Sequence, residues 1–477
     1  MCGPASAPAP APTPASAVAI DAPRARKGAL QPRVAVAVAS VLAAMALVVL
    51  DAAGAALSLP TIRAELEVSA AMSVRVLLAY QIALLIALLP VAALGESFGY
   101  RRIFSLGLAI FIAASLFCAA APSIAWLLAA RFVQGLGAAA IMALGVALLR
   151  QAVPERLGAA IGWSALTVAL CSAAGPLCAA MTLAMGGWRW LFLAYVPVGL
   201  LALLAARALP YVKGAGRSLD YSSVALSGAG FASLLLGLEA LVAAPAAAAF
   251  LLFGSAACFA LLVRRELPKS APLLPVDLLR GRSFRLSVIA SICCFAGQTS
   301  GMLALSFRLQ EELGQSPFAA GLYMTPWPVA VAAAALFSGR LSRRLSAAFL
   351  CTAGAGLLSL GLAGAAILPL SGDPIALAAL TILCGLGFGL FQVPNNRTMF
   401  LAAPESRSAA AGGMQGSARL LGQTGGALVM TLLFTWDPGI PVPRTALALG
   451  AIVSLGAAIV SALRARPTGE TRAETRT

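Results

Sequence analysis

The stretch ALVVLDAAGAALSLP, residues 46–60, carries one charged side chain, Asp51, in an otherwise apolar run. This run belongs to an apolar segment over residues 34–60, and about 20 such residues are enough for a helix that crosses the hydrocarbon core of a membrane. A charge in hydrocarbon costs at least about 2.5 kcal/mol, so acids at this depth usually face the protein interior. The stretch therefore predicts a membrane-spanning helix whose acid is turned towards an internal cleft that water reaches.

The composition extends this prediction to the whole chain. Hydrophobic residues make up 61% of the 477 residues and charged residues only 10%, which is far from the usage of soluble domains. An open sheet cannot cross a bilayer without leaving backbone groups unpaired, so the spans should be helices. We expect an all-α polytopic membrane protein with 14 transmembrane helices. The apolar runs lie at about 34–60, 74–94, 103–121, 124–149, 157–183, 188–208, 222–242, 245–263, 286–309, 318–338, 347–370, 374–400, 408–435 and 443–463.

Residue types that would support other functions are missing. The sequence has no histidine, which removes the usual proton shuttle and the commonest metal ligand. The nine cysteines form no Cys-x-x-Cys pair, so we interpret most of them as buried apolar residues and expect no metal site. No Gly-x-x-x-x-Gly-Lys-Ser/Thr stretch is present for ATP hydrolysis. We therefore expect no cofactor and no catalytic residues, with an ion gradient as the energy source; a membrane-embedded enzyme is the rival class.

Basic residues concentrate in alternate loops, and such loops mark the cytoplasmic side of a membrane protein. If both termini are cytoplasmic, only Arg63, Arg75, Arg189, Arg444 and Arg308 fall on the opposite side. The net charge of +16 is then a topology signal, and nucleic-acid binding is not expected. We expect a multi-pass protein of the cell (inner) membrane. Abundant Ala and Arg with scarce Lys indicate a bacterial source.

An internal repeat divides the chain into two halves. Gly135-Leu136-Gly137 recurs as Gly385-Leu386-Gly387, and at the same offset Pro154-Glu155 recurs as Pro404-Glu405. Repeated six-helix bundles around a central cleft are a common plan of membrane transporters. The predicted units are a disordered cytoplasmic tail (1–33), an N-terminal six-helix bundle (34–208), two inserted transmembrane helices with cytoplasmic linkers (209–285), a C-terminal six-helix bundle (286–463) and a cytoplasmic tail (464–477).

Three motifs resemble signatures of the major facilitator superfamily: LGESFGYRRIF (94–104), RFVQGLGAA (131–139) and AAGPLCAA (173–180). WRWLFLAYVPVGL (188–200) and ARLLGQTGGAL (418–428) are similar to its 14-helix drug:proton antiporter family, which includes multidrug, quaternary ammonium and methyl viologen exporters. The resemblance implies proton-coupled efflux of lipophilic, cationic drugs or biocides by alternating access. Export of an endogenous metabolite or a non-cationic amphiphile stays open, as does a uniporter or sensor with the same fold.

The resemblance also implies a cytoplasmic gating loop formed by Gly95, Glu96, Gly99, Arg101 and Arg102. Glu96 stands where the family signature usually has Asp. It keeps the negative charge, so it can pair with Arg101, Arg102 or a neighbouring helix end.

The antiporter motif predicts a hinge at Gly175 and Pro176, because proline removes a helix hydrogen bond and glycine loosens the backbone. Ala179 and Ala180 replace the glycine pair of the family motif. These small residues still permit close helix packing. Passive packing is the alternative to a hinge.

Depth arithmetic places two opposite charges at one level. Asp51 lies nine residues before Pro60, which is roughly 13 Å along the helix, and Arg131 lies roughly 11 Å into a helix that runs inward from the same side. We expect the two to pair, because an unpaired ion there is costly. The functional interpretation is that Asp51 exchanges Arg131 for a proton or a cationic substrate. The alternative is a purely structural tie.

Further polar residues are candidates for lining the pathway of the substrate. Arg419 is deep in its span and either faces the cleft or ties the second half together. Glu239 is expected to be solvated, and Glu311 and Glu312 to form an exposed loop pair. We expect a monomer that handles a small molecule and protons within the lipid bilayer. The pathway candidates are Tyr80, Gln81, Gln134, Gln298, Thr299, Gln392, Asn395, Asn396 and Arg419, of which Gln392, Asn395 and Asn396 could instead make helix-end hydrogen bonds.

Overall fold

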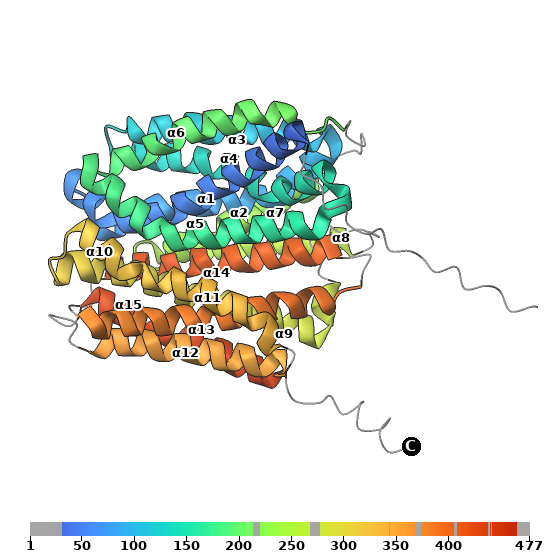
Figure 1. Ribbon diagram of the computed structural model, residues 1–477. Coiled ribbons are helices and arrows are strands. Elements are labelled where there is room, and N and C mark those ends of the chain that lie inside the picture. Colours follow the sequence, from blue (N-terminus) through green and yellow to red (C-terminus); the bar gives the residue numbers. More distant parts are fainter. Residues whose placement is uncertain are drawn as a thin grey trace, which may run out of the picture.

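The computed structural model describes residues 31–212, 220–267, 277–342, 344–368, 374–404, 408–436, 439 and 441–464. Every regular element in these residues is a helix, and the long helices run side by side (Figure 1). The all-α prediction is therefore confirmed for the described chain. Most of both predicted tails lies outside the described residues. The inner end of the first tail is described, and α1 already begins there, at Pro32.

The helices fall into three successive groups along the chain. The first group contains α1 (Pro32–Glu65), α2 (Ala70–Phe98), α3 (Tyr100–Ala119), α4 (Ile124–Ala152), α5 (Leu157–Gly186) and α6 (Trp188–Ala205). The second contains α7 (Tyr221–Glu239) and α8 (Pro245–Glu266). The third contains α9 (Arg282–Phe307), α10 (Pro317–Met324), α11 (Pro326–Leu341), α12 (Ala347–Ile367), α13 (Pro374–Leu401), α14 (Ser408–Trp436) and α15 (Val442–Leu463).

Twelve helical units in the described residues are long and apolar enough to cross a membrane, with α10 and α11 counted as one. The number becomes 13 if the two parts of α5, Gly162–Ser172 and Ala174–Gly186, form one span with a 45° bend. The remaining long helix, α14, lies alongside the others in Figure 1. A polytopic membrane protein with about 12 spans is thus established, and the count of 14 stays a prediction.

Close helix packing recurs in the two halves. In the first, a Cβ atom on Gly137 would lie 2.6 Å from the carbonyl oxygen of Gly107, so α4 contacts α3 through bare backbone. In the second, a Cβ atom on Gly354 would lie 2.6 Å from the carbonyl oxygen of Gly387, which joins α12 to α13 in the same way. Small residues permit such approach between membrane helices. The repeated glycines of the sequence therefore mark equivalent packing sites.

The helices α7 and α8 form a hairpin at the boundary between the halves. Phe231 and Phe259 pack edge to face with ring centroids 5.0 Å apart, while Phe250 and Phe253 of α8 are more than three-quarters exposed. α7 contacts both α2 and α14. The hairpin therefore packs along the edge where the two halves meet, and it presents apolar side chains outward, as a lipid-facing helix does.

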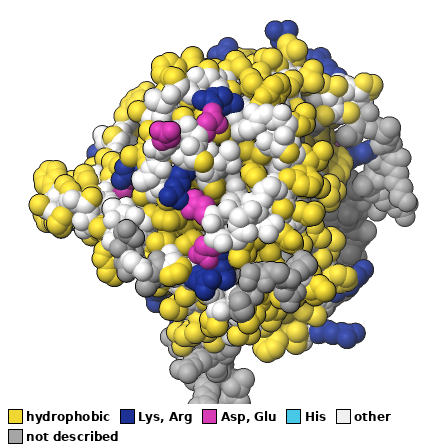
Figure 2. All heavy atoms as spheres, turned by 90° about the vertical axis from the view of Figure 1, so that its left-hand side faces the viewer, with side chains coloured by type: hydrophobic (Ala, Val, Ile, Leu, Met, Phe, Trp, Pro, Cys, Tyr) yellow, Lys and Arg dark blue, Asp and Glu magenta, His cyan; other side chains and the backbone are white. Residues whose placement is uncertain are grey.

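The two ends of the bundle differ in their charge arrangement. We call the end where α1 begins and α15 ends the terminal face, and the other end the far face, which is turned towards the viewer in Figure 2. All five arginines that the charge pattern places on the far face have an acidic partner, so this face is close to neutral. Glu239, Glu311 and Glu312 are thus paired rather than simply solvated. The pairs are Arg63–Glu311, Arg75–Glu239, Arg189–Glu65, Arg308–Glu312 and Arg444–Glu312.

Gly354 provides a test of this packing. In Gly354→Ala the new methyl group would lie 2.6 Å from both the carbonyl oxygen of Gly387 and the amide nitrogen of Phe391. Backbone atoms cannot rotate away, so we expect destabilisation by about 1–3 kcal/mol and a clear loss of thermal stability in detergent. Gly356→Ala, in the same helix with open space around it, is the matched control. Equal unfolding temperatures for both variants would contradict the proposed packing.

Candidate transport site

The centre of the first half holds a buried ion pair. Asp51 of α1 and Arg131 of α4 are both 0% exposed, and Nη1 of Arg131 lies 2.8 Å from each carboxylate oxygen. The predicted pairing is therefore present. Its desolvation penalty is large, so removing one partner of such a pair typically costs about 3–5 kcal/mol.

Polar neighbours fix the geometry of this pair. Nη1 of Arg131 also donates to the side-chain oxygen of Gln134 at 2.6 Å, and the Gln134 amide nitrogen donates to the hydroxyl of Ser115 at 2.9 Å. Nε of Arg131 donates to the carbonyl oxygen of Val76 at 3.4 Å. The pair thus links α1 and α4 to α3 and α2, which makes it the polar junction of the first half.

Aromatic rings cover the arginine. The guanidinium carbon of Arg131 lies 4.3 Å from the ring centroid of Tyr80 and 5.4 Å from that of Phe192, within the range of cation–π attraction. The hydroxyl of Tyr195 is buried without a hydrogen-bond partner in the described residues, and it would lie 3.0 Å from a Cβ atom on Gly54. This enclosure excludes water. The expectation that water reaches Asp51 is therefore wrong for this conformation, and the helices must rearrange before the carboxylate can exchange a proton.

The gating loop is shaped by Gly99, which separates α2 from α3 with a φ of 98° that favours glycine. The expected ion pair of Glu96 is absent among the described residues, where Glu96 is exposed. Arg101 instead donates to the carbonyl oxygen of Leu209 at 3.0 Å, and Arg102 lies over the ring of Tyr211 at 5.2 Å. Both arginines are directed towards the segment after α6, which is why they miss Glu96. Gly95 is buried against α4, where a Cβ atom would lie 2.6 Å from Leu144.

The bend of α5 lies next to the predicted hinge. It separates Ser172 from Ala174, and Pro176 removes the hydrogen bond to the carbonyl of Ser172. Gly175 packs against α1, since a Cβ atom there would lie 2.7 Å from that of Ala53. A bend of α5 and a close contact between α5 and α1 therefore lie next to each other at this motif.

The two halves touch directly near the far face. The hydroxyl of Ser306 donates to the carbonyl oxygen of Ala56 at 3.3 Å, and the amide of Gln310 donates to that of Leu57 at 3.1 Å. Gly321 of α10 packs on α5, because a Cβ atom there would lie 2.8 Å from the carbonyl oxygen of Pro176. These contacts close the boundary between α1, α5 and the third helix group at this end.

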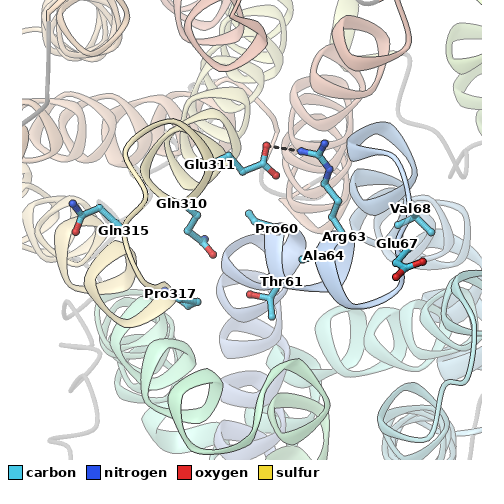
Figure 3. A pocket seen from close by; sticks show the side chains of 10 residues that line it. All are labelled: Pro60, Thr61, Arg63, Ala64, Glu67, Val68, Gln310, Glu311, Gln315 and Pro317. Carbon is cyan, nitrogen blue, oxygen red and sulfur yellow. Dashed lines mark hydrogen bonds and ion pairs between the residues drawn. The ribbon is translucent and has the colours of Figure 1, made fainter.

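A groove of about 680 Å³ lies over this closure (Figure 3). Across the groove, Nη1 of Arg63 lies 2.6 Å from Oε2 of Glu311, and the two residues come from different halves. Such a part-exposed pair contributes only about 0–1 kcal/mol, so the buried contacts beneath the groove carry most of the closure. The groove is lined by Pro60, Thr61, Arg63, Ala64, Glu67, Val68, Gln310, Glu311, Gln315 and Pro317.

The pathway candidates separate into buried and accessible groups. Tyr80, Gln81 and Gln134 are buried, with Gln134 inside the ion-pair network. Asn395 is fully buried and bonded to the carbonyl oxygen of Ser287 at 3.1 Å and to Arg464 at 2.9 Å. It therefore ties α13 to α9 at the terminal face. The partly exposed candidates are Gln298, Thr299, Gln392, Asn396 and Arg419.

Sequence reasoning missed the contacts that join elements far apart in the chain. Ser115, Ser306 and Gln310 are ordinary polar residues in apolar helices, so nothing in their local sequence marks them. Arg308 is fully buried and contacts the carbonyl oxygens of Ala365 and Leu368, which end α12. A five-residue π-helical turn at the end of α9 places it there. No group of three or more possible metal ligands occurs in the described residues.

Helices in two equivalent groups, a buried ion pair and a closure between the groups are features expected of a membrane transporter. The comparison with protein families agrees, because the model of the major facilitator superfamily matches residues 40–427. The chain belongs to this superfamily of transporters, and it is not an enzyme.

Known relatives cover most of the chain. The uncharacterized transporter YebQ of Escherichia coli (strain K12) is 41% identical over 90% of this chain and 95% of its own length. The riboflavin transporter RibZ of Clostridioides difficile (strain 630) is 26% identical over 76% and 80%. The multidrug resistance protein Stp of Mycobacterium tuberculosis (strain CDC 1551 / Oshkosh) is 30% identical over 82% and 74%.

Among solved structures, an auto-inhibited peptide transporter of the POT family superposes with a TM-score of 0.69 at 17% identity. The superposition covers 92% of this chain and 98% of that one. At this identity the likeness concerns the fold.

The ion pair predicts a specific pattern of stability. Arg131→Met should destabilise the protein by about 3–5 kcal/mol, because it leaves the Asp51 carboxylate buried and unpaired. Asp51→Asn combined with Arg131→Met should recover most of that loss. Thermal unfolding in detergent measures both, with Arg340→Met, at an exposed position, as the control. A double variant as unstable as Arg131→Met would show that the two charges are not coupled.

Gly321 tests the closure near the far face. Gly321→Val would force a side chain against Ala180 and Pro176, and overpacking costs about 1–3 kcal/mol. We expect the halves to separate at this end. Spin labels on Glu67→Cys and Gln315→Cys, in a chain freed of native cysteines, should report longer distances.

Gly339→Val, in the same broken span but with open space around it, is the control for this experiment. It should leave the label distances as they are in the parent chain. Unchanged distances in Gly321→Val would mean that α10 does not hold the closure.

Proposed function

We propose that the protein exports an amphiphilic small molecule from the cell in exchange for protons, by alternating access. The observation that carries this proposal is the fully buried Asp51–Arg131 pair at mid-depth. A carboxylate that holds a cation in one state and a proton in another can couple proton movement to a conformational change. The absence of an ATP-binding motif in the sequence agrees with a gradient as the energy source.

The coupling runs along α1. Asp51 lies five and six residues before Ala56 and Leu57, whose carbonyl oxygens accept the hydrogen bonds from the other half. A proton on Asp51 removes the charge that holds Arg131, which frees α1 to move relative to α4. That movement would break the contacts near the far face. The bend of α5 beside Ala53 supplies a second place where the boundary can open.

Orientation follows from charge. The far face is close to neutral because its arginines are paired with acids. The remaining basic loops lie on the terminal side, and we therefore propose that this side is cytoplasmic. The protein then works in the cell membrane with both termini inside. We propose that it acts as a monomer, because each half supplies its own helix contacts.

The relatives support two kinds of substrate. Stp is named a multidrug resistance protein and RibZ a riboflavin transporter. A lipophilic cationic drug agrees with the first name and with the acid at Asp51. A non-cationic amphiphile, such as a metabolite, is favoured by one observation: Asp51 is already neutralised by Arg131, whereas Arg419 has no acidic partner in the described residues.

Asp51→Asn tests whether the carboxylate couples transport to protons. In inside-out vesicles energised with a proton gradient, the wild type should accumulate ethidium, fluorescein or both, and should release protons when the dye is added. Asp51→Asn should reduce this accumulation about tenfold or more, to the level seen after the gradient is dissipated, because the side chain no longer binds a proton. Asparagine keeps the shape but leaves Arg131 buried without its counter-ion, which typically costs about 3–5 kcal/mol, so accumulation is compared per amount of folded protein.

Glu155→Gln, at an exposed position on the terminal side, is the control and should transport as the wild type does. Coupled export that survives in Asp51→Asn would remove this residue from the mechanism. A wild type that moves neither dye with the gradient would contradict export of such amphiphiles altogether.

A further inference from the structure

Arg419 is a deep cation that the coupling mechanism leaves unused. It lies 11 residues after the start of α14 and 17 before its end, about 16 Å and 26 Å along the helix. Its Nε atom is buried without a hydrogen-bond partner, and no ion pair joins it to any described residue. The residue as a whole is partly exposed. Part of this side chain is therefore accessible to a ligand.

The charges at this depth do not balance. Asp51 is the only acid in the middle of the described helices, and both of its oxygens are taken by Arg131. Arg419 is therefore an uncompensated positive charge. An unpaired ion in the membrane interior is costly and usually marks a functional site. The missing partner must carry negative charge, and no residue of the described chain supplies it.

The helix that carries Arg419 packs against a helix of the other half. α14 packs against α2, where a Cβ atom on Gly416 would lie 3.5 Å from Leu88. Tyr80 and Gln81 lie on α2, the helix of the other half that α14 packs against. The Tyr80 hydroxyl and the side-chain oxygen of its neighbour Gln81 are buried, and neither has a hydrogen-bond partner among the described residues. A buried polar group left unpaired costs about 1–3 kcal/mol, so this cluster is incomplete without a ligand.

We propose that Arg419 and Tyr80 bind the acidic group of the transported molecule, a carboxylate-bearing amphiphile. The guanidinium N–H groups only donate hydrogen bonds, and the phenolic O–H can donate one, so the two together suit an anionic oxygen acceptor. They come from different halves of the protein, where an alternating-access transporter holds its substrate. This inference rests on the proposed export function and specifies its substrate class. It selects the non-cationic candidate over the cationic one.

Tyr80 connects this site with the ion pair. The guanidinium carbon of Arg131 lies 4.3 Å from the centroid of the Tyr80 ring, and the buried Tyr80 hydroxyl has no hydrogen-bond partner among the described residues. A substrate oxygen bound to the hydroxyl would therefore sit within one aromatic ring of the proton-coupling pair. Substrate and proton can then be sensed by the same side chain.

A binding experiment on the purified full-length protein tests this inference without any proton gradient. Fluorescein carries a carboxylate and a phenolate at neutral pH, and rhodamine 123 has the same ring system as a cationic methyl ester. Fluorescence anisotropy should show that the wild type binds fluorescein more tightly than rhodamine 123. Arg419→Gln should weaken fluorescein binding about tenfold or more, because it removes the positive charge that pairs with the carboxylate.

Three further variants make the result specific. Arg419→Lys keeps the charge and should weaken fluorescein binding less than Arg419→Gln does. Tyr80→Phe removes one hydroxyl and should weaken it a few-fold. Arg340→Gln removes an exposed arginine and should have no effect, which controls for net charge. If Arg419→Gln fails to fold, as judged by thermal unfolding, the Arg419→Lys and Tyr80→Phe results decide.

The inference is overturned if the wild type prefers rhodamine 123, if it binds no fluorescein, or if a folded Arg419→Gln binds fluorescein with unchanged affinity. Each of these results leaves proton-driven export untouched, since binding needs no gradient. Conversely, normal fluorescein binding without gradient-driven transport would contradict the proposed function and leave the acid-binding site in place.

Discussion

The first half of the protein is organised around one buried ion pair in a medium that penalises isolated charge. Asp51 and Arg131 have no contact with solvent, so each depends on the other to stay charged. The arginine also holds Gln134 and the carbonyl oxygen of Val76, and in this way four helices share one polar junction. The apolar packing of these helices tolerates many sequences, whereas the junction tolerates few. It fixes which faces of α1 and α4 meet.

In the proposed mechanism, this dependence lets a proton act as a mechanical signal. Hydrophobic contacts between membrane helices differ little from contacts with lipid, so they supply little preference for one arrangement. A charged pair supplies a large preference, which disappears when the acid is protonated. Because Asp51 and the closure contacts of Ala56 and Leu57 lie on the same helix, a change at the pair is transmitted through rigid backbone. The exposed pair of Arg63 and Glu311 adds little to the energy and mainly aligns the two halves.

Sequence reasoning recovered the helices, the superfamily and the Asp51–Arg131 pair because each has a local signature. Long apolar runs predict the helices. The equal depth of Asp51 and Arg131 in their helices predicts the pair. It failed where partners are set by tertiary geometry: Glu96 lacks its expected arginine because Arg101 bonds to Leu209. It also could not see that aromatic side chains close Asp51 off from water, since periodicity gives depth but not enclosure.

The two deep arginines differ in whether the described chain supplies an acidic partner. Arg131 and Arg419 both lie in the interior of long helices, α4 and α14. One has an acid from its own chain and the other has none among the described residues. An unneutralised arginine at this depth would repel a cationic substrate at short range. A protein that only had to bind cations would therefore gain nothing from Arg419. A site that selects an acidic group needs it, and the neighbouring proton-linked pair then has an anion, rather than a cation, to respond to.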